Sequence, residues 1–370
     1  MASNEEPVTK TKKPSDSAFK QQRLPAWQPI LTAGTVLPTF FVIGIAFIPI
    51  GVGLLYFSDE VKEIVVDYTN CEQKLLNNNT KEYDISSGET CAKIIEKNSN
   101  AECHCAVDFV LPEDIPGSVY MYYGLTNYYQ NHRRYVKSRD DNQLLGHLEL
   151  TPSNDCNPYQ IDKKTQKPYA PCGAIANSLF NDNITLYSKS DGWVPLLKTG
   201  IAWPSDKNIK FRNPPIEQGG SLEEAFKPFA KPPNWKKNIW ELDLQDPNNN
   251  GFQNEDLIVW MRTAALPTFR KLYRRIDHHN SKYPAFQDGL RKGNYTLNVE
   301  YSYSVSGFDG TKRMILSNTS ILGGKNPFLG IGYIVVGCLC LFLGVLLLFV
   351  HVKCSKSTTE MINVSPRTPY

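Results

Sequence analysis

The sequence has no run of basic residues and no known nucleic-acid-binding motif. Its 40 Lys and Arg residues nearly balance its 37 Asp and Glu residues, which leaves a net charge of +3, and the basic residues are scattered along the chain. A nucleic-acid-binding protein concentrates positive charge on one face or one segment. We therefore expect no nucleic-acid partner.

Motifs for catalysis are also missing. The sequence contains no glycine-rich phosphate loop, no zinc-protease motif and no G-x-S-x-G nucleophile motif. Two pairs of adjacent carboxylates, Asp140–Asp141 and Glu255–Asp256, are expected to face solvent. The histidines between the two apolar blocks described below stand outside any such motif: His104, His132, His147, His278 and His279. We expect no catalytic residue, no bound cofactor and no ATP binding.

Apolar residues are concentrated near the two ends of the chain. The mean hydropathy of −0.36 is that of a soluble protein, yet Leu31–Phe57 and Phe328–Val352 contain no acidic or basic side chain except His351. About twenty apolar residues suffice to cross a bilayer as a helix. The sequence therefore predicts transmembrane helices over residues 30–57 and 328–352, the first of them an uncleaved signal anchor because a long polar segment precedes it.

The charges that flank the two blocks predict the topology. Both tails, residues 1–29 and 353–370, carry basic residues and are expected to be cytosolic by the positive-inside rule. The region between the spans, residues 58–327, has no further stretch that could cross, so it is predicted to be one exoplasmic domain. The basic residues in question are Lys10, Lys12, Lys13, Lys20, Arg23, Lys353, Lys356 and Arg367.

Glycosylation sequons support an exoplasmic location for this domain. Four candidate acceptors lie inside it: Asn78, Asn183, Asn294 and Asn318. A fifth sequon at Asn363 is expected to stay unmodified, because it lies in the cytosolic tail and is followed by Pro366.

Six of the nine cysteines lie in the same domain: Cys71, Cys91, Cys103, Cys105, Cys156 and Cys172. An even number in an oxidising compartment predicts three disulfides, for which sequence permits about fifteen pairings. Cys156 with Cys172 is the favoured local bridge. Cys103 and Cys105 are expected to point to opposite sides of a strand and to bond other partners. Cys103-His104-Cys105 offers zinc-type ligands, but no second ligand pair follows at zinc-site spacing, so we expect no metal.

The exoplasmic domain is predicted to be mainly antiparallel β with helical insertions, an α+β fold. Strands are expected where aromatic and β-branched residues alternate. A helix broken or kinked by Pro267 is predicted over Asn254–Ile276. The segment Asp246–Gly251 begins like a calcium loop but lacks the final Glu, so we interpret it as an Asx-rich turn that caps this helix. The predicted strands are 106–111, 119–123, 295–305 and 313–320.

Two further features concern contacts. The Tyr-rich run 119–135, which ends in Asn-His-Arg-Arg-Tyr, is either a binding face or a half-buried strand and turn, and we favour the second interpretation. Small residues in transmembrane helices permit close approach of a partner helix. The glycines concerned are Gly34, Gly44, Gly51 and Gly53 in the first block and Gly330, Gly332, Gly337 and Gly344 in the second.

Several of these segments carry a specific resemblance. They are AFKQQRLPAWQPILTAGT at 18–35, YYGLTNYYQNHRRY at 122–135, PCGAIANS at 171–178, the stretch 251–270, and GGKNPFLG at 323–330. With these the chain resembles the family of transmembrane accessory subunits of type IV P-type ATPases, the phospholipid flippases, named after the yeast cell-division-cycle-fifty protein. The resemblance spans nearly the whole chain in order.

The resemblance implies a non-catalytic subunit in a heterodimer with a ten-span catalytic α-subunit. The α-subunit hydrolyses ATP and moves membrane lipids, whereas the accessory subunit supports folding, exit from the endoplasmic reticulum and the transport cycle. The implied locations are the endoplasmic reticulum, Golgi, endosomes or secretory vesicles, and plasma membrane. The implied disulfides are Cys71–Cys105, Cys91–Cys103 and Cys156–Cys172. The alternatives that share this topology are a free-standing receptor or adhesion glycoprotein and an ectoenzyme.

Overall fold

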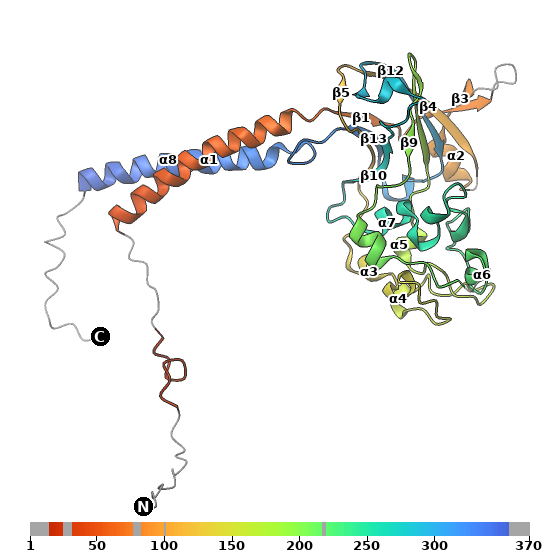
Figure 1. The fold of residues 1–370 in the computed structure, drawn as a ribbon, viewed down its shortest axis with the longest axis horizontal. Helices are drawn as coiled ribbons and strands as arrows, with labels where there is room; N and C mark the ends of the chain where they lie inside the picture. Colours follow the sequence, from red (N-terminus) through yellow and green to blue (C-terminus); the bar gives the residue numbers. More distant parts are fainter. Residues whose placement is uncertain (1–14, 25–31, 77–82, 100, 217–219, 355–370) are drawn as a thin grey trace, which may run out of the picture. The chain divides into compact units, whose positions relative to one another are not determined.

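A computed structural model describes residues 15–24, 32–76, 83–99, 101–216 and 220–354 (Figure 1). The chain divides into two compact units. The first comprises Met1–Leu55 and Pro327–Tyr370, and the second comprises Tyr56–Asn326. The Asn78 sequon and the Asn363 sequon lie outside the described residues.

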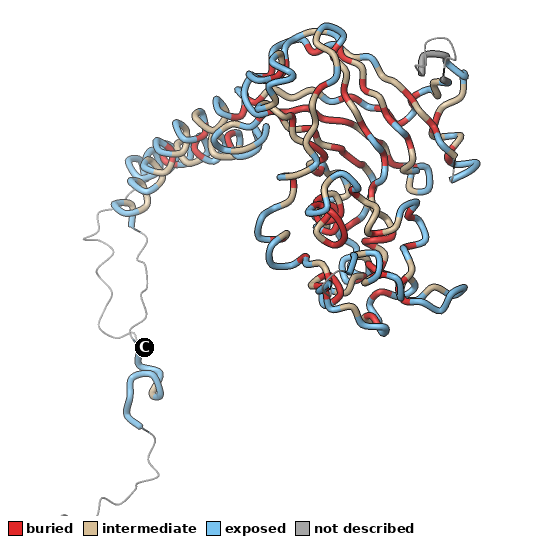
Figure 2. Tube along the Cα trace, turned by 45° about the vertical axis from the view of Figure 1, so that its right-hand side comes forward, coloured by how far each residue is buried: buried red, intermediate tan, exposed pale blue. Residues whose placement is uncertain are grey.

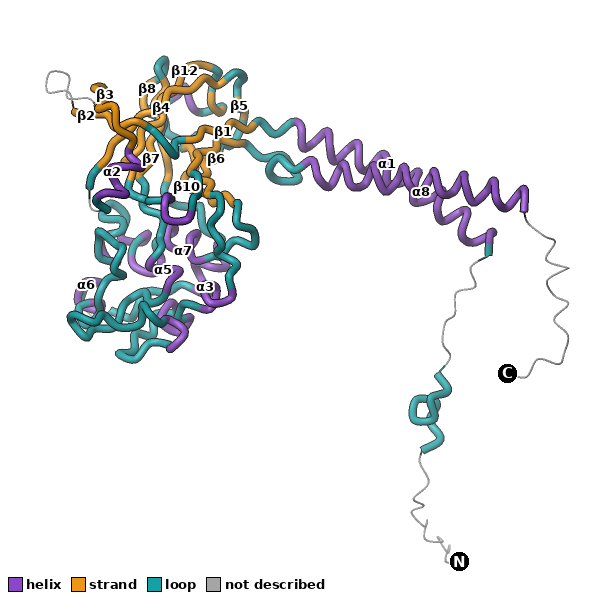
Figure 3. The backbone as a smooth tube through the Cα atoms, turned by 180° about the vertical axis from the view of Figure 1, so that it is seen from behind, coloured by secondary structure: helices purple, strands orange, loops and turns teal. Residues whose placement is uncertain are grey.

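The first unit is a pair of long helices, α1 (Ala33–Asp59) and α8 (Pro327–Cys354), which run side by side (Figure 3). They contain 27 and 28 residues and are long and apolar enough to cross a membrane. At a rise of about 1.5 Å per residue each covers about 40 Å, more than the roughly 30 Å of a hydrocarbon core. The prediction of a two-span membrane protein is confirmed.

The second unit contains two antiparallel sheets. The five-stranded sheet has the order β1-β13-β6-β10-β9, the six-stranded sheet has the order β3-β2-β4-β12-β7-β8, and β5 pairs with β11. The first sheet consists of β1 (Glu63–Asp67), β13 (Lys312–Ser317), β6 (Tyr120–Leu125), β10 (Phe269–Ile276) and β9 (Leu196–Leu197). The other strands are β3 (Tyr83–Thr90), β2 (Glu72–Leu76), β4 (Cys103–Leu111), β12 (Gly293–Tyr301), β7 (Asn183–Ser188), β8 (Gly192–Trp193), β5 (Ile115–Pro116) and β11 (Gly289–Leu290).

The two sheets share one hydrophobic core, and their buried positions alternate with exposed ones along the strands (Figure 2). Met121, Leu125 and Leu297 are fully buried members of it. Polar bonds also cross between the sheets, because the Ile184 N–H of β7 donates to the Tyr273 hydroxyl of β10 at 2.9 Å. This alternation is the period-2 pattern of strands with one buried face.

Short helices and loops gather at one end of the sheets (Figures 1 and 3). They complete the α+β fold predicted from the sequence. The α-helices are α2 (Cys91–Lys97), α3 (Arg133–Lys137), α4 (Asp141–Leu144), α5 (Ala174–Asn177), α6 (Leu222–Phe226) and α7 (Glu255–Met261). Single turns are η1 (Asn154–Cys156), η2 (Asp206–Lys210), η3 (Ile239–Glu241), η4 (Pro247–Asn249), η5 (Gly251–Gln253), η6 (Pro284–Phe286) and η7 (Ser306–Phe308).

The four predicted strands correspond to β4, β6, β12 and β13, although β12 ends at Tyr301 and β13 at Ser317, before the predicted ends at 305 and 320. The predicted helix over Asn254–Ile276 is wrong in its second half. Helix α7 ends at Met261, and Phe269–Ile276 forms β10, which pairs with β6. Pro267 cannot continue a helix, and the apolar side chains beyond it fit a half-buried strand as well as they fit a helix. Pairing with β6 decides between the two.

The two ends of the second unit are tied together. The Lys62 N–H donates to Asn318 Oδ1 at 2.9 Å, and the Asn318 N–H donates to the Lys62 carbonyl at 3.3 Å. Farther along, the Asn326 N–H donates to Ser58 Oγ in the last turn of α1 at 3.0 Å. The chain therefore enters and leaves this unit at one place.

Candidate functional site

Glycines line the contact between α1 and α8. A Cβ placed on Gly51 would lie 2.8 Å from the Gly330 carbonyl oxygen, and one on Gly337 would lie 2.9 Å from Ile48 Cγ1. A Cβ on Gly44 would lie 2.5 Å from Leu341 Cγ. These distances are too short for any side chain, so the two backbones approach as closely as they do only because glycine stands at these positions.

Other glycines of α1 and α8 do not lie at the contact between the two helices. Around Gly53 and Gly332 the described residues leave open space, because an added Cβ would meet no atom within 4 Å. Large apolar side chains such as Val42, Ile45 and Phe342 also point outward and are 65% exposed. The glycine stripe predicted to receive partner helices is thus used mainly within this chain, and the outward face of the pair is apolar.

Leucine at Gly51 is expected to force α1 and α8 apart and to lower the stability of the full-length chain in detergent by about 1–3 kcal/mol, the usual effect of overpacking. Gly53→Leu is the matched control, since the same side chain enters open space two residues away. Thermal melting followed by size-exclusion chromatography measures both variants. Equal melting temperatures for the two variants would contradict this role for Gly51.

Three of the family-like segments meet in one cluster of the second unit. The Trp260 Nε1–H donates to the Ile175 carbonyl at 2.8 Å, and the Tyr135 hydroxyl lies 2.8 Å from Ser178 Oγ. Tyr128 packs edge-on against Tyr135. Burial raises the pKa of the Tyr135 phenol well above its ordinary value, which keeps it protonated. The rings of the Tyr-rich run are therefore mainly structural, as we favoured.

Buried ionic groups support the same part of the fold. Glu255 accepts hydrogen bonds from the Ile201 and Ala202 N–H groups at 2.7 and 2.9 Å and from Lys207 at 2.8 Å. Burial raises the pKa of Glu255, but these hydrogen bonds outweigh it and the net pKa is lowered. Arg274 pairs with Asp256 at 2.6 Å. The expectation that the Glu255–Asp256 pair merely faces solvent was therefore wrong.

The other carboxylate pair and one of the histidines have local structural bonds. Asp140 caps α4 through the Asn142 and Gln143 N–H groups, while Asp141 pairs with Arg139 at 2.9 Å. His278 Nε2 accepts the Val119 N–H at 3.0 Å. These contacts assign Asp140, Asp141 and His278 to the framework of the fold.

The Asx-rich segment before α7 is confirmed as a turn that leads into a helix cap. Asp246 Oδ1 accepts the Asn248 N–H at 2.9 Å, and Asn254 Oδ1 accepts the Leu257 N–H at 3.1 Å. Asn254 is the N-cap of α7. Asp246 and Asn254 thus accept backbone N–H groups as an Asx turn and an N-cap do.

The structure joins the cysteines as Cys71–Cys105, Cys91–Cys103 and Cys156–Cys172, the pairing that the resemblance implies. Cys103 and Cys105 lie on β4 and are both buried on the same face. Our expectation of opposite sides was wrong, because residues two apart on a strand share a face. Both bridges consequently leave β4 in the same direction.

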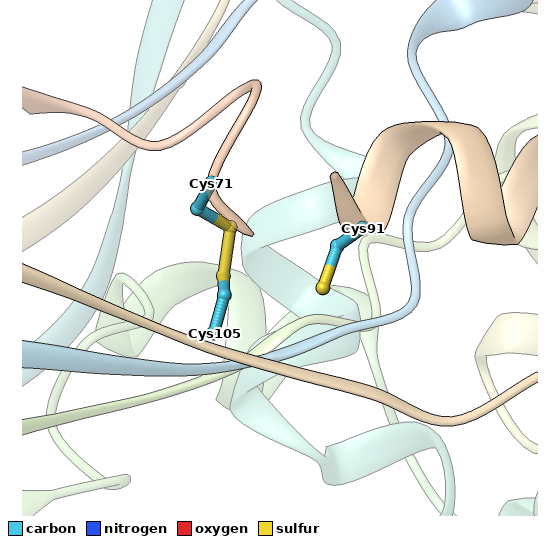
Figure 4. Close-up of side chains that lie close together, drawn as sticks. All are labelled: Cys71, Cys91 and Cys105. Atoms are coloured by element: carbon cyan, nitrogen blue, oxygen red, sulfur yellow. A yellow bond between two sulfur atoms is a disulfide. The ribbon is translucent and has the colours of Figure 1, made fainter. Parts of the chain in front are cut away.

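This arrangement brings three sulfurs together. Figure 4 shows Cys91, at the start of α2, with its sulfur beside the Cys71–Cys105 disulfide. The sulfur atoms of Cys71, Cys91 and Cys105 lie within 4.8 Å of one another. Each belongs to a disulfide, so none is a thiolate that could hold a metal ion.

A cavity of about 520 Å³ opens within the second unit beside the start of β7. Its lining favours neither sign of charge, because four acidic and four basic side chains contribute to it. Asp256 and Arg274 already pair with each other there. The charged residues are Glu102, Asp182, Asp256, Glu300, Lys198, Lys236, Lys237 and Arg274.

Comparison with known proteins finds relatives that match nearly the whole chain. Residues 54–357 match the model of the LEM3 (ligand-effect modulator 3) family / CDC50 family. Cell cycle control protein 50A of Mus musculus is 53% identical over 95% of this chain and 92% of its own length. Cell cycle control protein 50B of Homo sapiens is 48% identical over 92% and 94%. ALA-interacting subunit 3 of Arabidopsis thaliana is 41% identical over 90% and 84%. The resemblance seen in the sequence is confirmed: the chain belongs to the CDC50 family.

Proposed function

We propose that this protein is the non-catalytic accessory subunit of a phospholipid-flipping type IV P-type ATPase and forms a heterodimer with the catalytic α-subunit. The observation that carries the proposal is the family match over residues 54–357. A relative with 41% identity bears a name that describes a subunit that interacts with another protein. In the complex the α-subunit hydrolyses ATP and moves lipid, and this chain supports folding, exit from the endoplasmic reticulum and translocation.

The proposed topology places both tails, 1–29 and 353–370, in the cytosol and the domain 58–327 on the lumenal or extracellular side. Three disulfides in the second unit support an oxidising compartment for it. The basic residues of both tails fit the cytosolic side. We propose that the complex resides in the endoplasmic reticulum, Golgi, endosomes or secretory vesicles, and plasma membrane.

A physical route to the supporting role follows from the two units. The paired helices are packed tightly on each other and leave an apolar outward face, which suits contact with helices of a larger membrane protein. The disulfide-bonded domain offers a rigid surface to exoplasmic loops. A subunit that binds the folded pump and not its unfolded forms stabilises the folded pump by mass action.

Glycosylation tests the proposed orientation. Asn183 and Asn294 are exposed, whereas Asn318 is only 8% exposed and its Nδ2 donates to the Pro116 carbonyl at 3.1 Å. We expect Asn183→Gln and Asn294→Gln each to remove one glycan and so to run faster than the wild type on a gel. After glycosidase treatment the wild type and both variants should run together. Asn318→Gln is expected to leave the mobility unchanged. A wild-type chain whose mobility glycosidase leaves unchanged would contradict the exoplasmic location of the domain.

The role itself is tested by purification of the full-length chain from its native membranes in mild detergent, with mass spectrometry of the proteins that co-elute. We expect one ten-span ATPase in about equal amount. A Cys172→Ser variant is expected to lose this partner, and Cys354→Ser, which changes a free exposed cysteine, is expected to keep it. A wild-type chain that elutes without any ATPase would instead support a free-standing glycoprotein receptor. Lipid transport or nucleotide hydrolysis by the chain alone would contradict the non-catalytic role.

A further inference from the structure

Two large apolar side chains project from a tight turn just before α8. Ile321 is 92% exposed and Leu322 is 58% exposed. They occupy the two central positions of the turn Ser320–Gly323. Removal of apolar surface from water is worth about 25 cal/mol per Å², so two adjacent side chains this exposed would gain from contact with a nonaqueous environment.

The turn holds these side chains outward. The Ser320 N–H donates to the Gly323 carbonyl at 2.8 Å, and the Gly323 N–H donates to the Ser320 carbonyl at 3.0 Å. Ser320 Oγ also accepts the Leu322 N–H at 3.3 Å and donates to the Gly323 carbonyl at 3.1 Å. Gly323 has a φ of +106°, which other residues rarely adopt. The projection is therefore fixed by the backbone.

Chain length limits how far this turn can lie from the start of the membrane spans. Leu322 is four residues from Asn326, and four extended residues cover at most about 14 Å. Asn326 donates its N–H to Ser58 in the last turn of α1. The same turn of α1 carries Tyr56, which is 62% exposed, and tyrosine is enriched where a span meets the headgroups. The apolar turn is consequently joined to the start of α8 by a short stretch of chain and lies within about 14 Å of Asn326.

We propose that Ile321 and Leu322 insert into the exoplasmic leaflet of the bilayer and anchor the base of the domain there. The binding partner is the lipid surface at the level where headgroups meet acyl chains. Lys325, which is exposed three residues beyond Leu322, can accompany this insertion with its ammonium near lipid phosphates. The anchor adds a contact between domain and bilayer that is independent of the two spanning helices.

Fluorescent labels at single cysteines test the insertion. The full-length chain is prepared with Cys338, Cys340 and Cys354 replaced by Ala, so that the only reactive thiol is the new one in Ile321→Cys. An environment-sensitive NBD label is attached, and the chain is placed in phosphatidylcholine nanodiscs. Leu244→Cys is the matched control, because Leu244 is 78% exposed and lies on a loop far along the chain from either span.

Lipid spin-labelled at the top of the acyl chain is expected to quench the Ile321→Cys label at least threefold more strongly than the Leu244→Cys label. Iodide in the water is expected to show the reverse order. Equal quenching of both labels by lipid, with free access of iodide to position 321, would overturn the proposal. A label at 321 that neither lipid nor iodide reaches would also overturn it, because protein would then cover the turn.

Discussion

Replacement of Lys312 by Met is expected to lower the free energy of unfolding of the second unit by about 3–5 kcal/mol, because it leaves a buried carboxylate without its cation. The Lys312 Nζ lies 2.7 Å from Asp182 Oδ2, and both side chains are 0% exposed. The ammonium also donates to the Tyr303 carbonyl at 2.6 Å and lies 3.0 Å from the centre of the Tyr301 ring. Denaturant unfolding of the purified chain, followed by tryptophan fluorescence, measures the loss.

Asp182 explains why the effect should be large. Its Oδ1 accepts the N–H groups of Ser302 and Tyr303, both at 2.7 Å, and its Oδ2 accepts the Tyr68 hydroxyl at 3.1 Å. The carboxylate therefore links the segment before β7, the end of β12, strand β13 and the segment after β1. Loss of its cation weakens a junction that both sheets share.

Two further variants separate charge pairing from simple loss of a side chain. Lys189→Met is the surface control, because Lys189 is half exposed and pairs with exposed Asp108 at 3.2 Å, and exposed pairs contribute about 0–1 kcal/mol. In Lys312→Met with Asp182→Asn, the unpaired charge is gone, and part of the stability should return. A loss below about 1 kcal/mol for Lys312→Met would show that the pair is unimportant.

The same lysine predicts a dependence on pH. Burial lowers the pKa of Lys312 to about 8, although the Asp182 carboxylate opposes this shift. In the unfolded chain the pKa is about 10.4, so between pH 8 and 10 the unfolded state binds more protons. The free energy of unfolding contributed by Lys312 should therefore rise with pH across this window and be flat below it. The stability difference between wild type and Lys312→Met, measured from pH 7 to 10, should widen, and a constant difference would contradict the shift.

Loss of the Cys156–Cys172 bridge is expected to lower the free energy of unfolding by about as much as Lys312→Met does. The bridge spans 16 residues, and a loop of that size corresponds to about 3 kcal/mol on the chain-entropy account. It holds a small satellite core in which Tyr169 packs against the two cysteines. We expect Cys172→Ser to keep the glycoprotein in the endoplasmic reticulum, visible as glycans that remain sensitive to endoglycosidase H.

The backbone on either side of Cys172 shows why the bridge should matter beyond its own loop. The Cys172 N–H donates to Gln143 Oε1 at 2.8 Å, and a Cβ on Gly173 would lie 2.1 Å from the Ser138 carbonyl oxygen. The segment is thus packed directly onto the chain between α3 and α4. Cys338→Ser, at a free cysteine, should mature normally. Mature glycans on Cys172→Ser would contradict the importance of the bridge.

Local patterns predicted the spans and the strands. Two long apolar blocks give helices without further information, because only helices satisfy their backbone within a membrane. Alternation of apolar residues likewise placed β4, β6, β12 and β13. The pattern did not predict the strand at residues 269–276, because the spacing of Phe269, Leu272 and Tyr273 suits both a helix and a strand. The partner strand that decides between them lies about 150 residues earlier in the chain.

The buried ionic groups could not be found from the sequence. Lys312 and Asp182 are 130 residues apart and lie in no motif. Lys271 is 93% buried and donates to the carbonyls of Val259, Trp260 and Arg262, where α7 ends. Burial lowers the pKa of Lys271 well below its ordinary value. Only the fold places these lysines inside, and the sequence offered no signal beyond their presence in strands with buried neighbours.

The tie between the two ends of the second unit also determines how load can pass through the protein. Only residues 60–62 separate α1 from β1, and hydrogen bonds at Lys62, Asn318 and Asn326 leave little slack on the return path to α8. The two connections between the second unit and the long helices are therefore short and lie next to each other. A displacement of the segment that follows α1 would therefore also be felt by the segment that precedes α8, because the same hydrogen bonds hold both.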